Sequence, residues 1–203
     1  MPERMADHWW WLPGMRPGRR MLLWHLLPHG QAEVIDLVRR CQDGLAGVDG
    51  LDLVPAEWLH MTTQIVGFED EIPGGRVEAL VAGAGRRMGA LAPIEVELGR
   101  PWVHSEGVAL GVRPEGALDP VRQAMREAAD ETVGVHPLDG GPGWTPHISA
   151  AYSNAGGPAA PIVEALDPCP APVSLRVAAA HLVAQVRDGH LYRWEPVAEV
   201  ALG

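Results

Sequence analysis

The chain has 203 residues and a formal charge of −10, with 26 acidic against 16 basic residues. This balance argues against a broad, sequence-independent grip on nucleic acid, which draws most of its affinity from Lys and Arg that neutralise phosphates. Cys41 and Cys169 are too few for a disulfide framework, and neither a signal peptide nor an apolar run near the roughly 18 residues of a membrane span is evident. We expect a soluble cytoplasmic protein whose nucleic-acid ligand, if it has one, is small or held locally.

The first third of the chain predicts a strand, a helix and a second strand. Residues 19–27 (RRMLLWHLL) form an apolar run that is typical of a buried strand. Apolar side chains recur at helical spacing through 31–47, and Gly47 marks the end of that helix. Residues 57–68 (EWLHMTTQIVGF) then alternate between apolar and polar positions, as a half-buried strand does.

The rest of the chain predicts a comparable series of elements. We expect helices at about 76–88, 119–132 and 161–166, an antiparallel strand pair within 93–115, and strands at 144–154, 173–185 and 189–200. The dipeptide Asp188-Gly189 predicts a hairpin turn between the last two strands. The order suggests two loosely duplicated halves without a direct repeat of fixed period.

Two of the predicted strands carry a histidine followed two positions later by a hydroxyl residue. These are His60 with Thr62 and His147 with Ser149. Side chains at i and i+2 of a strand point to the same face, so each strand supplies an imidazole beside a hydroxyl. A single strand histidine is more often a structural residue, and chance matches to so short a pattern are common. The context strengthens both matches, because each follows a loop with proline and lies near a tryptophan: Pro55 and Trp58, and Pro146 and Trp144.

In these two stretches the chain resembles the 2H phosphoesterase superfamily, and more closely its 2′-5′ RNA ligase-like and RNA 2′,3′-cyclic phosphodiesterase members. The matching segments are LHMTTQIVG, which begins at Leu59, and PHISAAY, which begins at Pro146. The resemblance implies that residues 1–203 form one α+β domain with two pseudo-symmetric, intertwined lobes. Antiparallel sheets would flank a central cleft, and each lobe would contribute one motif.

The resemblance also implies an activity, the hydrolysis of an RNA-terminal 2′,3′-cyclic phosphate to a 2′-phosphate, with 2′-5′ RNA ligation as a side reaction. His60 and His147 would serve as the general acid and base, because histidine is accessible in either protonation state near neutrality. Thr62 and Ser149 would donate hydrogen bonds to the phosphate oxygens. No metal or cofactor is required, and the sequence does not assign which histidine is the base.

Two further residues are candidate substrate contacts. Tyr152 stands after the second motif, where many family members carry an arginine, and its phenol can still donate to phosphate. Trp24 could stack on a nucleobase, as could Trp102 or Trp144, and core packing is the alternative for each of them. The run WWW at 9–11 is either a lid over the cleft or an anchor for the N-terminus.

Other functions remain open at this point. The acidic balance favours a small cyclic nucleotide over a long RNA as the substrate, since it would need fewer basic contacts. A function of another class is a phosphate-binding or RNA-end-binding module that uses the same cleft without turnover. The remaining histidines have no recognised zinc spacing. No protein partner or membrane is indicated, and we expect a monomer.

Overall fold

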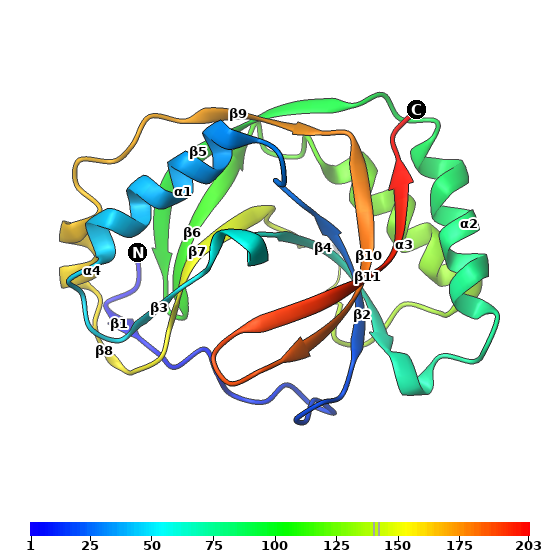
Figure 1. The fold of residues 1–203 in the computed structure, drawn as a ribbon, viewed down its shortest axis with the longest axis horizontal. Coiled ribbons are helices and arrows are strands. Elements are labelled where there is room, and N and C mark those ends of the chain that lie inside the picture. Colours follow the sequence, from blue (N-terminus) through cyan, green and yellow to red (C-terminus); the bar gives the residue numbers. More distant parts are fainter. Residues whose placement is uncertain (140, 142) are drawn as a thin grey trace.

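The computed structural model describes residues 1–139, 141 and 143–203. In this part of the chain, two antiparallel sheets lie side by side and helices cover their outer faces (Figure 1). The helices are α1 (Ala32–Leu45), α2 (Arg76–Met88), α3 (Asp119–Thr132) and α4 (Ala160–Ala165), with short 3₁₀ turns η1 (Ala56–Trp58) and η2 (Glu69–Glu71). The predicted α+β class is confirmed.

The first lobe is built on a four-stranded sheet in the order β11-β10-β2-β4. Its strands are β2 (Met21–Leu26), β4 (Met61–Phe68), β10 (Ala179–Arg187) and β11 (Tyr192–Ala201). Helices α2 and α3 pack against each other, α2 contacts β11 and α3 contacts β4. We call this unit lobe 1; strand β4, which carries the first motif, lies at the edge of its sheet.

The second lobe is built on a five-stranded sheet in the order β3-β7-β6-β5-β9. Its strands are β3 (Leu51–Leu53), β5 (Ile94–His104), β6 (Gly107–Arg113), β7 (His147–Ser153) and β9 (Val173–Val177). Helix α1 contacts β5, β7 and β9, and α4 packs beside α1. We call this unit lobe 2. A separate two-stranded ribbon pairs β1 (Arg4–Met5) with β8 (Gly157–Pro158).

The two lobes exchange helices. Helix α1 follows β2 of lobe 1 but packs on lobe 2, whereas α3 follows β6 of lobe 2 but packs on lobe 1. One continuous hydrophobic cluster therefore contains residues of both sheets, such as Leu22 and Leu110. A second, smaller cluster groups Met21, Leu23 and Trp194 on the opposite face of the lobe 1 sheet. This exchange fixes the two motif strands relative to each other.

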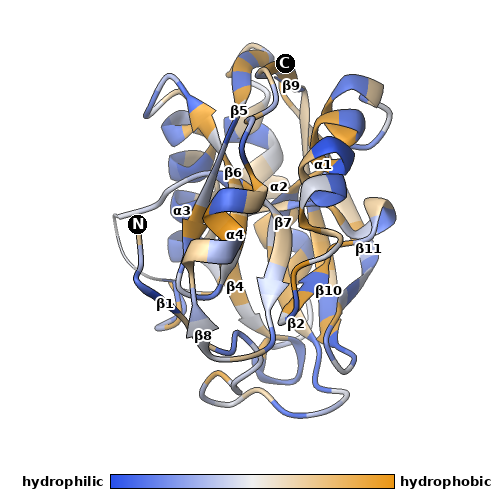
Figure 2. Cartoon of the chain, turned by 90° about the vertical axis from the view of Figure 1, so that its left-hand side faces the viewer, coloured by the Kyte–Doolittle hydropathy of each residue, from blue (hydrophilic) through white to orange (hydrophobic). Residues whose placement is uncertain are grey.

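The helices form where the sequence gives them an apolar stripe. In α1 the buried side chains are Val34, Leu37, Val38, Cys41 and Leu45, the spacing of one face of a helix. The hydropathy colouring of Figure 2 shows hydrophobic and hydrophilic residues alternating around the helices. Among the described residues, no helix has both the length and the apolar character needed to cross a membrane.

Most predicted elements are confirmed, and the helices expected at 76–88 and 119–132 have those bounds. The strand expected at 173–185 is wrong, because the chain forms two strands there. Strand β9 pairs with β5 in lobe 2, and β10 pairs with β2 in lobe 1. The crossing lies at Ala178, within a run of three alanines whose small apolar side chains continue the pattern of both strands. The expected two-residue hairpin is also longer, because Arg187 pairs with Tyr192.

Candidate active site

The first motif begins at the junction between η1 and β4. His60 is the residue before β4, and its Nδ1 lies 2.8 Å from the carbonyl oxygen of Trp58. A carbonyl oxygen can only accept, so Nδ1 carries the hydrogen and donates it. The other ring nitrogen, Nε2, is therefore left free to accept or deliver a proton. The side chain of Thr62 lies two positions on, on the same face of the strand.

The second motif repeats this local geometry. His147 opens β7, and its Nδ1–H donates to the carbonyl oxygen of Thr145 over 2.8 Å. Each motif histidine is thus held by the carbonyl oxygen two residues before it. Ser149 is buried on the same face of β7 as His147. The two halves present the same pair of groups, an imidazole with a free Nε2 and a hydroxyl.

The two motif strands come together between the sheets, where β4 and β7 are in contact, and we call this region the cleft. The pKa of His60 is lowered to about 4, chiefly by burial; the hydrogen bond to Trp58 opposes this shift, and the nearby charge of His147 adds to it. His60 is consequently neutral at neutral pH, with a free lone pair on Nε2. The residue is only 9% exposed, and its ring packs edge-on against Trp194 with centroids 4.9 Å apart.

Tyr152 reaches the motif face through a β-bulge. Strand β6 pairs Ala109 with Ser149 and Val108 with Ala151, so Ala150 is an extra residue in β7. Tyr152 is five positions after His147, and in a regular strand this odd spacing would place the two side chains on opposite faces. The bulge brings Tyr152 back to the face of His147. Burial raises the pKa of the Tyr152 phenol, and the Ser149 hydroxyl beside it partly offsets that shift. The structure thus brings Tyr152 together with the second motif.

A third histidine, which the sequence did not single out, supports the first motif. His25 of β2 is fully buried, pairs across the sheet with Thr62 and stacks on His60 with ring centroids 4.3 Å apart. Its Nε2 lies 3.3 Å from the Thr62 hydroxyl oxygen, and its Nδ1 has no partner among the described residues. The sequence holds a signal for this residue, since His25 continues the alternate face of Met21 and Leu23.

The hydrogen on His25 belongs on Nε2, for an energetic reason. A buried N–H without an acceptor costs about 1–3 kcal/mol, and orphaned buried N–H groups are rarer in proteins than under-satisfied acceptors. With the hydrogen on Nε2, His25 donates to Thr62 and leaves the Thr62 hydroxyl hydrogen free to point into the cleft. Burial lowers the pKa of His25 well below its ordinary value, so the ring stays neutral. His25 therefore orients Thr62 as a donor.

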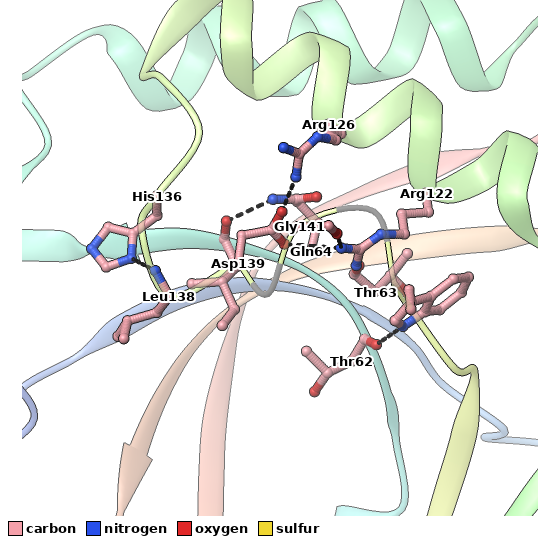
Figure 3. A network of polar contacts seen from close by, with 11 residues as sticks. Thr62, Thr63, Gln64, Arg122, Arg126, His136, Leu138, Asp139 and Gly141 are labelled. Carbon is pink, nitrogen blue, oxygen red and sulfur yellow. Dashed lines mark hydrogen bonds and ion pairs between the residues drawn. The ribbon is translucent and has the colours of Figure 1, made fainter. Parts of the chain in front are cut away.

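Two backbone carbonyl groups of the first motif accept hydrogen bonds from side chains outside the sheet, one in the loop before the second motif and one in α3. Strand β4 is a sheet edge, so its outward carbonyls need partners elsewhere. The indole Nε1 of Trp144 donates to the Thr62 carbonyl oxygen over 3.0 Å, and Arg122 of α3 donates to that of Thr63 over 2.6 Å (Figure 3). Arg122 also pairs with Asp139, whose side chain is 3% exposed and also pairs with Arg126. This network ties β4 to the segment that enters β7.

The segment before β2, residues 6–15, ties the two lobes together at one end of the cleft. His8 stacks on Tyr152 at 4.2 Å, and its Nδ1 lies 3.1 Å from Glu106 of lobe 2. The Tyr192 hydroxyl of lobe 1 donates to His8 Nε2 over 3.1 Å. Trp9 is buried and donates from its indole to Asp52 over 2.8 Å. Of the two alternatives for the WWW run, Trp9 is an anchor.

Trp24 does not lie in the site. Its side chain is 0% exposed and packs in the main hydrophobic cluster. The expectation that it contacts substrate is corrected, because β2 turns Leu22, Trp24 and Leu26 into the core and the alternate side chains toward the cleft. Within residues 1–139, 141 and 143–203, no group of three His, Cys, Asp or Glu is arranged to hold a metal ion.

Comparison with known proteins agrees with this geometry. A model of the 2′-5′ RNA ligase superfamily matches residues 27–189, a span that includes both motifs. The chain belongs to this superfamily. As a 2H phosphoesterase it is expected to act on phosphoesters in general. No curated protein sequence matches the chain.

Solved structures share the fold of this 2H phosphoesterase. The TT0787 protein of Thermus thermophilus has a TM-score of 0.67 and 21% identity, over 90% of this chain and 97% of that one. E. coli LigT in apo form has a TM-score of 0.65 and 21% identity, over 90% and 97%. E. coli LigT complexed with 3′-AMP has a TM-score of 0.64 and 22% identity, over 91% and 98%. At this level of identity the likeness establishes the fold.

Proposed function

We propose that this 2H phosphoesterase is a metal-independent cyclic phosphodiesterase that hydrolyses a terminal 2′,3′-cyclic phosphate of RNA to a 2′-phosphate. The observation that carries the proposal is the matched hydrogen bonding of His60 and His147, both 2.8 Å from a carbonyl oxygen. It leaves two Nε2 atoms and two hydroxyls on motif faces that meet in one cleft. This is the set that acid–base opening of a cyclic phosphate requires.

The unequal environments of the two histidines favour one assignment of roles. His60 is neutral because burial lowers its pKa to about 4, so its Nε2 accepts a proton from water. The water oxygen bonds to phosphorus, the bond between phosphorus and O3′ breaks, and His147 acts as the general acid, delivering a proton from Nε2 to O3′. The products are a 2′-phosphate and a 3′-hydroxyl. His60 then carries the proton taken from water and His147 has lost its own to O3′, and proton exchange with solvent restores the pair.

The hydroxyls and Tyr152 contribute hydrogen bonds to the phosphate. Thr62 and Ser149 donate to the two non-bridging oxygens as charge develops on them. Tyr152 takes the place of the arginine found in many relatives and donates from a neutral phenol. If an RNA 5′-hydroxyl replaced water as the nucleophile, with the same breakage of the bond between phosphorus and O3′, the product would be a 2′-5′ linkage. Water at about 55 M outcompetes that nucleophile, so hydrolysis is the principal reaction.

A small cyclic nucleotide is the second candidate substrate, and the charge distribution favours it. Ten of the sixteen basic residues are arginines in ion pairs with carboxylates, which leaves few to follow an RNA backbone. E. coli LigT, which has the same fold, has been crystallised with 3′-AMP, with phosphate and with ATP. A ligand of this kind would need fewer basic contacts from this chain than a long RNA would.

Product analysis tests the proposal and separates it from a binding module without turnover. Purified protein is incubated in EDTA with nucleoside 2′,3′-cyclic phosphates and with a short RNA that ends in one. Wild type should form the 2′-phosphate, and His60→Ala and His147→Ala should not. His29→Ala is the matched control, because His29 is exposed and lies outside the two motifs. Product from neither substrate, together with nucleotide binding by all four proteins, would leave the binding module.

A further inference from the structure

Lobe 2 presents a three-by-three grid of side chains to the cleft. In an antiparallel sheet, directly paired residues have side chains on the same face. The rows run across β7, β6 and β5, and they are His147, Gly111 and Gly99; Ser149, Ala109 and Trp102; and Tyr152, Gly107 and His104. The middle strand therefore offers nothing larger than a methyl group between the second motif and Trp102.

Because β6 carries only small side chains here, the Trp102 indole can extend across it toward the second motif. A β-carbon built on Gly111 would lie only 3.6 Å from the indole Nε1, so the ring lies over β6. The ring centroids of Trp102 and His147 are 6.1 Å apart, and His104 flanks Trp102 at 4.9 Å. Trp102 is nonetheless 37% exposed. A large aromatic ring beside a motif histidine thus keeps part of its surface open to the cleft.

The other tryptophans near the motifs are buried or are already packed against other side chains of the protein. Trp24 is fully buried. The indole N–H of Trp144 donates to the Thr62 carbonyl oxygen, and the ring lies under the Arg122 guanidinium, 5.4 Å from it. Trp58 packs edge-on against Trp194 at 4.8 Å in the smaller hydrophobic cluster. Of the three tryptophans that the sequence offered as base platforms, the structure leaves Trp102 on the motif face and exposed.

We propose that Trp102 is the platform on which the base of the substrate nucleotide stacks. The backbones of Trp102 and Ser149 are separated by two strand spacings, about 10 Å, and the indole extends back over β6 to 6.1 Å from the His147 ring, a span on the order of one nucleoside. A phosphate held at Ser149 and His147 would place its ribose over Ala109 and its base against the indole. Every base has a π face, so the subsite accepts any nucleobase and reads size and flatness rather than sequence.

The inference rests on the proposed function and names the substrate class of the same site, a cyclic phosphate that carries a nucleobase. A comparison of two substrates isolates the base contact. One is a nucleoside 2′,3′-cyclic phosphate, and the other is glycerol 1,2-cyclic phosphate, which has no base. Trp102→Ala should raise KM for the nucleoside substrate about 5- to 100-fold with little change in kcat. The same variant should leave turnover of the glycerol substrate unchanged.

Two further variants make the comparison specific. Trp102→Phe keeps an aromatic face and should recover most of the lost affinity. Trp11→Ala removes a tryptophan of similar exposure, 43% against 37%, that lies against Arg187 away from the motif face. It should behave as wild type with both substrates. Equal losses on both substrates with Trp102→Ala, or no loss on either, would overturn the platform.

A binding measurement separates this inference from the proposed activity. Calorimetry compares the affinity of a nucleoside 2′-monophosphate with that of inorganic phosphate for wild type and Trp102→Ala, with no turnover involved. Trp102→Ala should weaken the nucleotide alone. If wild type turns over neither cyclic substrate but shows this contrast, the proposed function fails and the platform stands. If wild type binds the nucleotide no better than phosphate, the platform fails whatever the activity.

Discussion

Thr63 and Ala150 occupy equivalent positions in the two halves of the molecule. Each is the third residue after a motif histidine, and each is an extra, bulged residue of its strand, although β4 has a second bulge further on, at Val66. The bulge returns the fifth residue after the histidine to the histidine's face, which is Ile65 in lobe 1 and Tyr152 in lobe 2. The two half-sites are built alike but differ at this position, so one wall of the cleft is apolar and the other carries a phenol.

Replacement of Tyr152 by Phe tests the phenol. The ring should stay stacked on His8, so folding is retained, while the phosphate loses one hydrogen-bond donor. A hydrogen bond contributes about 0.5–1.5 kcal/mol, so kcat/KM should fall about 2- to 10-fold on a nucleoside cyclic phosphate. Tyr192→Phe is the control, because its hydroxyl bonds to His8 and lies off the motif strands. A kcat/KM equal to that of wild type in the Tyr152 variant would show that the Tyr152 hydroxyl does not bind the substrate phosphate.

Replacement of His25 tests whether it orients Thr62. His25→Leu removes the donor to the Thr62 oxygen, so kcat should fall about 3- to 10-fold with a smaller change in KM. His25→Gln places an amide N–H near the position of the imidazole Nε2 and should restore most of the rate. In a Thr62→Ala background neither change at His25 should matter further. Equal activity of the Leu and Gln variants would mean that His25 serves packing alone.

Acid should destabilise the folded chain through its buried histidines. Burial lowers the pKa of His60 and of His104 to about 4, and it lowers that of His25 well below its ordinary value. The unfolded chain binds protons at these sites below a pH of about 6.5, and the native chain does not. The free energy of unfolding should therefore fall as the pH drops from about 6.5 to about 4.

Urea titrations at several pH values measure this dependence. His25→Gln has one fewer buried histidine, so its unfolding free energy should change less steeply with pH than that of wild type. The exposed His29 provides the matched control, since His29→Ala should keep the wild-type slope. Parallel slopes for His25→Gln and wild type would contradict the neutral, buried state of His25.

Much of the fold could be predicted because the chain alternates or repeats apolar residues clearly. Helix α3 has its predicted bounds, since Val121, Met125 and Ala128 mark one face without ambiguity. The crossing at Ala178 could not be found, because alanine suits either sheet and either face. The motif pairs could be predicted from strand periodicity, whereas the face on which Tyr152 lies depends on a bulge that no particular residue type predicts. Long-range partners such as His25 need the sheet register, which local patterns do not contain.

Arg122 links the two motifs, and its removal should impair both stability and activity. Its side chain is 12% exposed, donates to the Thr63 carbonyl at the bulge of β4, and pairs with the buried Asp139. Arg122→Met keeps the apolar stem but leaves that carbonyl unpaired and Asp139 with Arg126 alone. Because Asp139 keeps its pairing with Arg126, the loss should be smaller than that of a buried charge left unpaired, about 3–5 kcal/mol, and the melting temperature should drop by a few degrees.

The activity loss should exceed what unfolding explains. Because Thr63 sets the bulge that aligns Thr62 with Ile65, kcat should fall even at temperatures where Arg122→Met is fully folded. Arg87→Met is the matched control, since Arg87 pairs across α2 and α3 with Glu127 and Glu131, both of which are exposed. Exposed pairs contribute about 0–1 kcal/mol, so this variant should melt near wild type and keep its rate. If the Arg122 variant were destabilised but kept the kcat of wild type, the hydrogen bonds of Arg122 would contribute to stability alone and not to catalysis.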